Sequence, residues 1–169
     1  MLSEMPIRIE KNYGTVGNGN NGGLKPIANL TFSSRIMVKD LIEKNLSYDK
    51  SMKEKPYLKL NDNLKKYYIL GIFDGDGCFS YTKKTKEWSI YSSDIMCNFI
   101  EDHLSKELSI TFNKRTFDHR NKNLNRTRTC SKENIRKIFN YLYSEKTVYL
   151  DRKYELAKKF MRDNNFEII

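Results

Sequence analysis

The 169-residue chain has few of the residues that bind zinc or form disulfides. Its three cysteines are Cys78, Cys97 and Cys130, no CxxC pair occurs, and there are only two histidines. An odd number of widely spaced cysteines argues against a structural zinc site and favours free thiols in a reducing compartment. The chain also has no apolar run of membrane-spanning length and no signal-peptide core at its N-terminus. We therefore expect an intracellular protein, in the cytoplasm of a bacterium or phage-infected cell or in an organelle such as a mitochondrion.

Acidic residues are scarce relative to basic ones. Lys and Arg number 31 against 21 Asp and Glu, for a net charge of +10. An excess of this size indicates a polyanionic partner, most commonly nucleic acid. The alternative is an AT-rich genome, whose codons favour Lys, Asn, Ile and Tyr. That alternative explains the lysines better than the arginines, which cluster at Arg115, Arg120, Arg126 and Arg128.

Hydrophobic periodicity and turn residues predict strands and helices in both parts of the chain. In the first part we expect a hairpin (residues 6–13 and 24–34) with a Gly/Asn tip, then a helix over residues 35–46. Ser33 or Ser34 is the expected N-cap of that helix. In the second part a glycine-bearing helix near residue 70 is followed by a regular series of elements. These are strands 78–84 and 88–92, a helix 95–108 capped by Asp94, basic strands 111–120 and 124–130, a helix 132–145 capped by Ser131, and a last helix 149–161.

The two parts share a pattern of strand, serine cap and helix. Aligning Ser34 with Ser131 places Val38 on Ile135 and Leu41 on Ile138. The pattern indicates a partial repeat, although two amphipathic helices often agree this well by chance. We therefore predict two parts, with residues 1–60 as the rear half of a unit and residues 61–169 as the complete copy.

The segment YYILGIFDGDGCFSY (residues 67–81) is unusual for a helix. It combines apolar residues with Gly71, Gly75 and Gly77, and it places Asp74 and Asp76 near the negative end of the helix dipole. Both features cost stability. A segment that tolerates this cost is a candidate functional site.

The nine residues ILGIFDGDG (69–77) resemble the signature of the LAGLIDADG homing endonucleases. The following elements fit the α-β-β-α-β-β-α unit of that family, so the resemblance implies an α+β fold with a saddle-shaped antiparallel sheet. It further implies that the last acid, Asp76, ligates a metal ion and that the carbonyl group of Gly75 assists.

The physical chemistry of the motif agrees with this resemblance. Gly71 and Gly75 lie four residues apart on one helical face, so two such helices can pack closely. Two Asp76 carboxylates brought together in this way repel each other unless cations neutralise them. A divalent metal, most plausibly Mg²⁺, is the natural cofactor for cleaving a phosphodiester bond there. Asp74 is expected to shape the helix end rather than to catalyse.

The resemblance also implies a basic residue near the reacting water, supplied by a late strand. Arg126 and Arg128 are the candidates, and Lys132 is a weaker one. Strand alternation places Cys78, Ser80, Thr82 and Lys84 on the side of Asp76, with Phe79 and Tyr81 facing the helices. Basic and polar side chains on such strands can contact phosphates and bases. The alternative is a solvated edge that carries lysine to prevent aggregation. The predicted DNA-binding residues are Ser80, Thr82, Lys84, Lys114, Arg115, His119, Arg120, Arg126 and Arg128.

Only one motif is present, whereas active members of this family combine two. The chain is therefore expected to form a homodimer or to need a second chain carrying the missing half. The leading hypothesis is a site-specific, Mg²⁺-dependent double-strand DNA endonuclease encoded by a mobile element such as an intron. The alternatives are a non-cleaving nucleic-acid-binding protein on the same scaffold (an intron RNA maturase or a DNA-binding regulator) and an inactive truncated endonuclease.

Overall fold

The structure is a computed structural model, and it describes residues 10–14, 25–29, 34–44, 46, 55–57, 59–117, 124–145 and 148–167. The chain divides into two compact units, Met1–Asp40 and Leu41–Ile169, and the boundary falls within the helix Arg35–Glu43. Each unit is described by itself. The predicted division after residue 60 rests on the proposed repeat and stays a prediction.

The first unit contains the predicted hairpin. Strand β1 (Glu10–Gly14) pairs antiparallel with β2 (Lys25–Asn29). Helix α1 (Arg35–Glu43) begins after Ser34, whose hydroxyl oxygen accepts a hydrogen bond from the Met37 amide at 3.2 Å. Ser34 is therefore the N-cap, whereas Ser33 lies outside the described residues.

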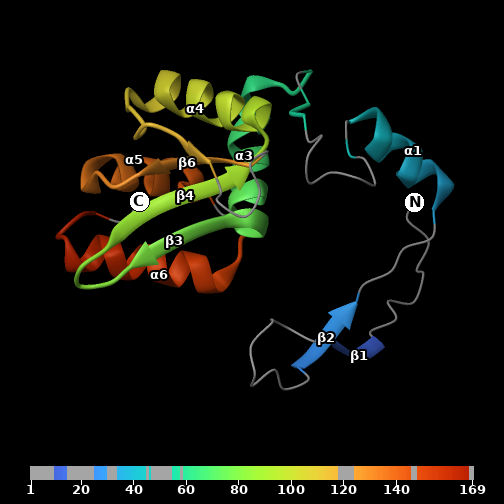
Figure 1. Cartoon of the computed structure of the whole chain (residues 1–169), viewed down its shortest axis with the longest axis horizontal. Helices are drawn as coiled ribbons and strands as arrows, with labels where there is room; N and C mark the ends of the chain where they lie inside the picture. Colours follow the sequence, from blue (N-terminus) through green and yellow to red (C-terminus); the bar gives the residue numbers. More distant parts are fainter. Residues whose placement is uncertain are drawn as a thin grey trace. The chain divides into compact units, whose positions relative to one another are not determined.

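The second unit carries the predicted α-β-β-α-β-β-α series and one further helix, which confirms the predicted α+β class. Its elements are α3 (Asp62–Asp76), β3 (Gly77–Tyr81), β4 (Lys86–Ser92), α4 (Asp94–Leu108), β5 (Thr116–Phe117), β6 (Asn125–Thr129), α5 (Lys132–Tyr143) and α6 (Asp151–Asp163). The four strands form one antiparallel sheet in the order β3-β4-β6-β5. In Figure 1 the long strands β3 and β4 pass in front of α5 and α6.

An aromatic cluster joins the inner face of the sheet to the helices. Trp88 on β4 is fully buried and stacks on Phe73 of α3, with ring centroids 5.3 Å apart. Phe79 on β3 meets Phe139 of α5 at 4.7 Å and Phe160 of α6 at 5.5 Å, both edge to face. Such geometry adds to the stabilisation from burial alone. The cluster fixes α3 against the sheet and so determines where the acidic end of α3 lies.

Three local predictions are wrong. The N-cap of α4 is Ser93, whose hydroxyl oxygen accepts the Met96 amide at 3.2 Å, and Asp94 is the first helical residue. Residues 82–84 form a turn rather than extending β3, because the Thr82 hydroxyl oxygen accepts the amides of Lys84 and Thr85. The first basic strand is only Thr116–Phe117 in the described part of residues 111–120.

The polar sequence EDHLSK (residues 101–106) predicts a surface position for His103, and this prediction is also wrong. The residue is only 8% exposed, and its Nε2 atom lies 2.8 Å from the Tyr141 hydroxyl group. Within the described part of the chain, no helix is long and apolar enough to cross a membrane.

Candidate active site and nucleic-acid interface

The acidic end of α3 is open to solvent on the glycine face. A Cβ atom added at Gly71 or Gly75 would have no atom within 4 Å outside its own neighbourhood, and both glycines are exposed. Asp76, the last residue of α3, is exposed as well. The structure thus presents a smooth helix face with a carboxylate at its C-terminal end.

Gly77 makes the abrupt turn from α3 into β3 possible. A Cβ atom at this position would lie 2.3 Å from the Phe73 ring and 2.5 Å from the Phe73 carbonyl oxygen. The requirement is for space, since the φ angle of Gly77 is −77°. Because the chain enters the strand at once, Asp76 is held at the junction of the helix and the sheet.

Asp74 connects the end of α3 to the start of α6. Its Oδ2 atom accepts the amide of Leu150, the N-cap residue of α6, at 2.8 Å. Asp74 is half-buried, whereas Asp76 is exposed. The two acids of the motif therefore have different surroundings, and Asp76 is the more accessible of the two.

Lys153, a residue of α6 that is 5% exposed, was not among the site residues predicted from the sequence. Its ammonium group donates to the carbonyl oxygens of Phe73, Asp74 (3.1 Å) and Gly77 (2.5 Å). Burial lowers the pKa of Lys153, as does nearby Arg152, while Asp74 and Asp76 act to raise it. The unfavourable acids at the helix end indicated that a compensating cation was needed. Nothing in the pattern showed which lysine supplied it.

The strand register gathers polar side chains on the outer face of the sheet. Cys78 and Ser80 of β3 point away from the aromatic cluster, as the predicted alternation requires, and they pair with Ser89 and Glu87 of β4. On β6 the outward residues are Arg126 and Arg128, opposite Tyr91 and Ser89. The two basic candidates for catalysis therefore lie together on this face.

Both arginines contact one carboxylate. Glu87, which is 8% exposed, forms an ion pair with Arg126 and another with Arg128 at 3.2 Å. The Arg126 guanidinium also lies 5.2 Å from the centre of the Tyr91 ring, a distance suited to cation–π attraction. Among the described residues, the buried Nε atoms of both arginines have no hydrogen-bond partner.

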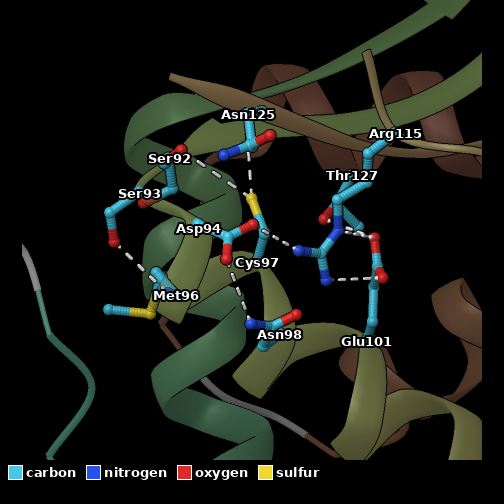
Figure 2. Close-up of polar contacts among 10 residues, drawn as sticks. All are labelled: Ser92, Ser93, Asp94, Met96, Cys97, Asn98, Glu101, Arg115, Asn125 and Thr127. Carbon is cyan, nitrogen blue, oxygen red and sulfur yellow. Dashed lines mark hydrogen bonds and ion pairs between the residues drawn. The ribbon is translucent and has the colours of Figure 1, made fainter. Parts of the chain in front are cut away.

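Arg115, another predicted DNA-binding residue, is held against α4. It forms a two-point ion pair with Glu101 (3.0 and 2.7 Å) and contacts Asp94 at 2.8 Å, as Figure 2 shows. Glu101 in turn accepts the Thr127 hydroxyl at 2.8 Å. This network links the segment before β5 to α4 and β6.

The remaining candidates lie in different places. Ser80 is half-buried on β3, and Thr82 and Lys84 are exposed in the turn that follows. Lys114 is exposed before β5, and Lys132 is the exposed first residue of α5. His119 and Arg120 lie outside the described residues.

The oxygen atoms at the end of α3 suit a hard divalent cation such as Mg²⁺, which prefers carboxylate and carbonyl ligands. Asp76 offers an exposed carboxylate and Gly75 a carbonyl group next to it. Over the described ranges, no three His, Cys, Asp or Glu residues come together as a metal site.

An α-β-β-α-β-β-α unit whose first helix ends in an exposed acid is the arrangement that the resemblance to homing endonucleases implied. The solved structures to which this chain is similar include homing endonucleases. One is I-CvuI in complex with its target Sro1.3 in the presence of 2 mM Ca, with 20% identity over 60% of this chain and 66% of that chain and a TM-score of 0.41. A second is I-CvuI with the I-CreI target in the presence of 2 mM Mg, with DNA not cleaved, at the same identity and coverage and a TM-score of 0.40.

A third similar structure is the homing endonuclease I-TnaI, with 18% identity over 62% of this chain and 71% of that chain and a TM-score of 0.41. This chain thus spans slightly less than two thirds of the I-CvuI chain. The sequence matches no protein-family model and no curated protein.

Proposed function

We propose that the protein is a site-specific double-strand DNA endonuclease that needs a divalent metal ion and two motif helices. The observation that carries this proposal is the position of Asp76, exposed at the tip of a helix whose Gly71 and Gly75 face is open. An exposed acid at the negative end of a helix dipole is unfavourable for folding alone. It becomes useful when a cation binds there.

The glycine face fits a second helix. Because the space above Gly71 and Gly75 is open, the backbone of another motif helix can approach closely, as small residues allow. Leu64, which is 47% exposed near the start of α3, adds apolar surface. Two copies of the chain packed in this way would place their Asp76 carboxylates side by side. A different chain carrying its own motif helix could occupy the same face.

In this arrangement each residue has a limited role. Asp76 and the Gly75 carbonyl would hold Mg²⁺, which supplies positive charge that activates water and stabilises the leaving oxygen. Hydrolysis joins the water oxygen to phosphorus and breaks one phosphorus–oxygen ester bond of the strand. The outer sheet face would bind the duplex, with Arg126 and Arg128 as the basic groups available to phosphate or guanine.

A cleavage selection tests the proposed activity. The purified chain is incubated with a randomised duplex library in Mg²⁺ and, in parallel, in EDTA, and the cut ends are sequenced. The proposal predicts a recurrent cut site only with Mg²⁺, and a particle of two chains of 20.1 kDa on DNA. The library is also tested with a co-purified or co-expressed partner chain. The proposal is contradicted if the library stays uncut under all these conditions in both Mg²⁺ and Mn²⁺.

A second candidate function is binding of nucleic acid without cleavage. The observation that favours it is Glu87, which engages both basic candidates for catalysis. In a filter-binding assay, a protein of this kind would retain duplex DNA or structured RNA. It would cleave neither of them, whichever divalent metal ion is added. Selective retention of an intron RNA would indicate a maturase, and selective retention of one duplex would indicate a regulator.

A further inference from the structure

We infer that Lys153 is a positioning residue for Asp76. It fixes the C-terminal end of the motif helix from the neighbouring helix α6. The inference rests on the proposed function, because it takes Asp76 to be a metal ligand. The contacts of Lys153 are observed in the structure and do not depend on that proposal.

The end of α3 has no ordinary C-cap. Helices leave their last four carbonyl groups unpaired, and these are commonly satisfied by a glycine in the left-handed conformation. Gly77 instead has φ −77° and ψ 156°, so the chain turns directly into β3, and its amide reaches back only to the Phe73 carbonyl. The remaining acceptors at this end need another donor.

Lys153 donates to one of these remaining acceptors, the Asp74 carbonyl oxygen, and to carbonyl oxygens on either side of it. An ammonium group has three N–H bonds, and the three carbonyl oxygens that it contacts belong to Phe73, Asp74 and Gly77. The same Nζ atom lies 4.6 Å from the centre of the Phe73 ring. These acceptors bracket Asp76 on both sides in sequence, so the contacts fix the backbone from which the Asp76 side chain projects.

Lys153 also provides positive charge where the helix dipole is negative. This charge offsets the cost of two carboxylates at the end of α3. Because its hydrogen bonds are to backbone carbonyl oxygens, Lys153 leaves the exposed Asp76 carboxylate available to a ligand. Two effects on a bound cation therefore oppose each other: the fixed geometry favours binding, and the nearby positive charge disfavours it.

The sign of the change on removing Lys153 decides between these effects. We would measure Mn²⁺ binding to the full chain on duplex DNA by electron paramagnetic resonance, for wild type, Lys153→Gln and Lys153→Met. If positioning dominates, both variants bind Mn²⁺ about tenfold more weakly, as for the loss of groups that orient metal ligands. Tighter or unchanged Mn²⁺ binding would overturn the inference. Glutamine keeps N–H donors without the charge, so Lys153→Gln serves if Lys153→Met does not fold.

A matched control separates positioning from stability. Lys66 is also buried, at 8% exposed, but it lies on the first half of α3 and contacts Glu145 and Ser144. Lys66→Met should lower the melting temperature without changing Mn²⁺ affinity. An equal loss of Mn²⁺ affinity in Lys66→Met would show that stability, and not position, is responsible.

Amide hydrogen exchange tests the same inference without metal or DNA. Lys153→Gln should speed exchange in a peptide spanning residues 73–78, and Lys66→Met should not. If wild type and Asp76→Asn bind Mn²⁺ alike, the proposed metal site is wrong, and the exchange comparison still decides whether Lys153 fixes the helix end. Unchanged exchange in Lys153→Gln would overturn the inference even for an active endonuclease.

Discussion

Glu87 and Arg126 form an ion pair on the outer face of the sheet, and the same carboxylate contacts Arg128 at 3.2 Å. The Glu87 side chain is only 10% exposed, so this acid is packed into the outer face between the basic side chains. It orients two guanidinium groups and partly neutralises them. Under the proposed function, Glu87 therefore weakens the attraction of this face for DNA phosphate.

Glu87→Gln should strengthen non-specific DNA binding. Freeing both arginines should make the slope of log K against log salt steeper by up to about 2, since each phosphate contact contributes about 0.9. Anisotropy titrations of a random duplex from about 50 to about 300 mM KCl measure this slope. Glu133→Gln is the control, because Glu133 pairs with Arg136 on the surface of α5. An unchanged slope in Glu87→Gln would mean that the outer face does not meet phosphate.

Arg115→Met should destabilise the fold and leave the salt dependence of DNA binding unchanged. Arg115 is held by Glu101 and Asp94, so its removal costs charge-assisted hydrogen bonds, about 2 kcal/mol of unfolding free energy. Urea denaturation measures that loss. Its exposed neighbour Lys114 is the control, and Lys114→Met should keep wild-type stability. A flatter salt slope in Arg115→Met would instead assign Arg115 to the DNA interface.

Alanine at two glycines of the motif should act in opposite directions. Gly77→Ala places a methyl group against Phe73 and should destabilise the chain by about 3 kcal/mol. Gly71→Ala meets no neighbour, and alanine favours a helix over glycine by about 1 kcal/mol, so the single chain should become more stable. If α3 pairs with a second copy, Gly71→Ala should also weaken self-association. Thermal unfolding and sedimentation velocity test both effects, and equal destabilisation by both alanines would contradict the open face.

His103 should make the protein less stable in mild acid. Burial lowers the pKa of His103 below its usual value of 6.5, so the unfolded chain takes up the proton first as the pH falls. Stability is then complete above pH 6.5 and declines as the pH drops from 6.5 toward the lowered pKa of the folded protein. Denaturation curves at several pH values, with His103→Gln as the comparison, measure this decline. If the free energy of unfolding falls equally with pH in both proteins over this range, the effect belongs to other titrating groups.

The order of the elements was predictable because local signals agreed with it. Ser34 and Ser131 cap the helices that follow them, and alternation in β3 places Phe79 inside the core. The N-cap at Ser93 and the turn at Thr82 were local misassignments, whereas other errors arose where distant residues decide the outcome. The burial of His103 is one example, because the hydroxyl group that hydrogen-bonds its ring belongs to Tyr141, far along the chain. Arg115 and Arg126 appear in the sequence as free basic groups, whereas Glu101 and Glu87, from other elements, engage them.

The main features of the motif were also predictable from local sequence. Glycine spacing and acid placement are local properties of α3, so the accessible Asp76 and the open Gly71 face follow from the sequence. The residue that makes this end of the helix tolerable, Lys153, comes from α6, more than seventy residues later. Helical periodicity predicts that α6 forms, but it does not predict that one of its lysines meets three carbonyl groups of α3.

The most direct test of the central claim is a comparison of wild type with Asp76→Asn on a duplex recovered by selection. Binding is measured by anisotropy in Ca²⁺, and strand cleavage is measured on a gel in Mg²⁺. We predict that Asp76→Asn binds the duplex with wild-type affinity and cuts neither strand, because under the proposed function this exposed carboxylate serves to hold the metal ion. Cleavage by Asp76→Asn at the wild-type rate would contradict the assignment of this residue, and with it the proposed site.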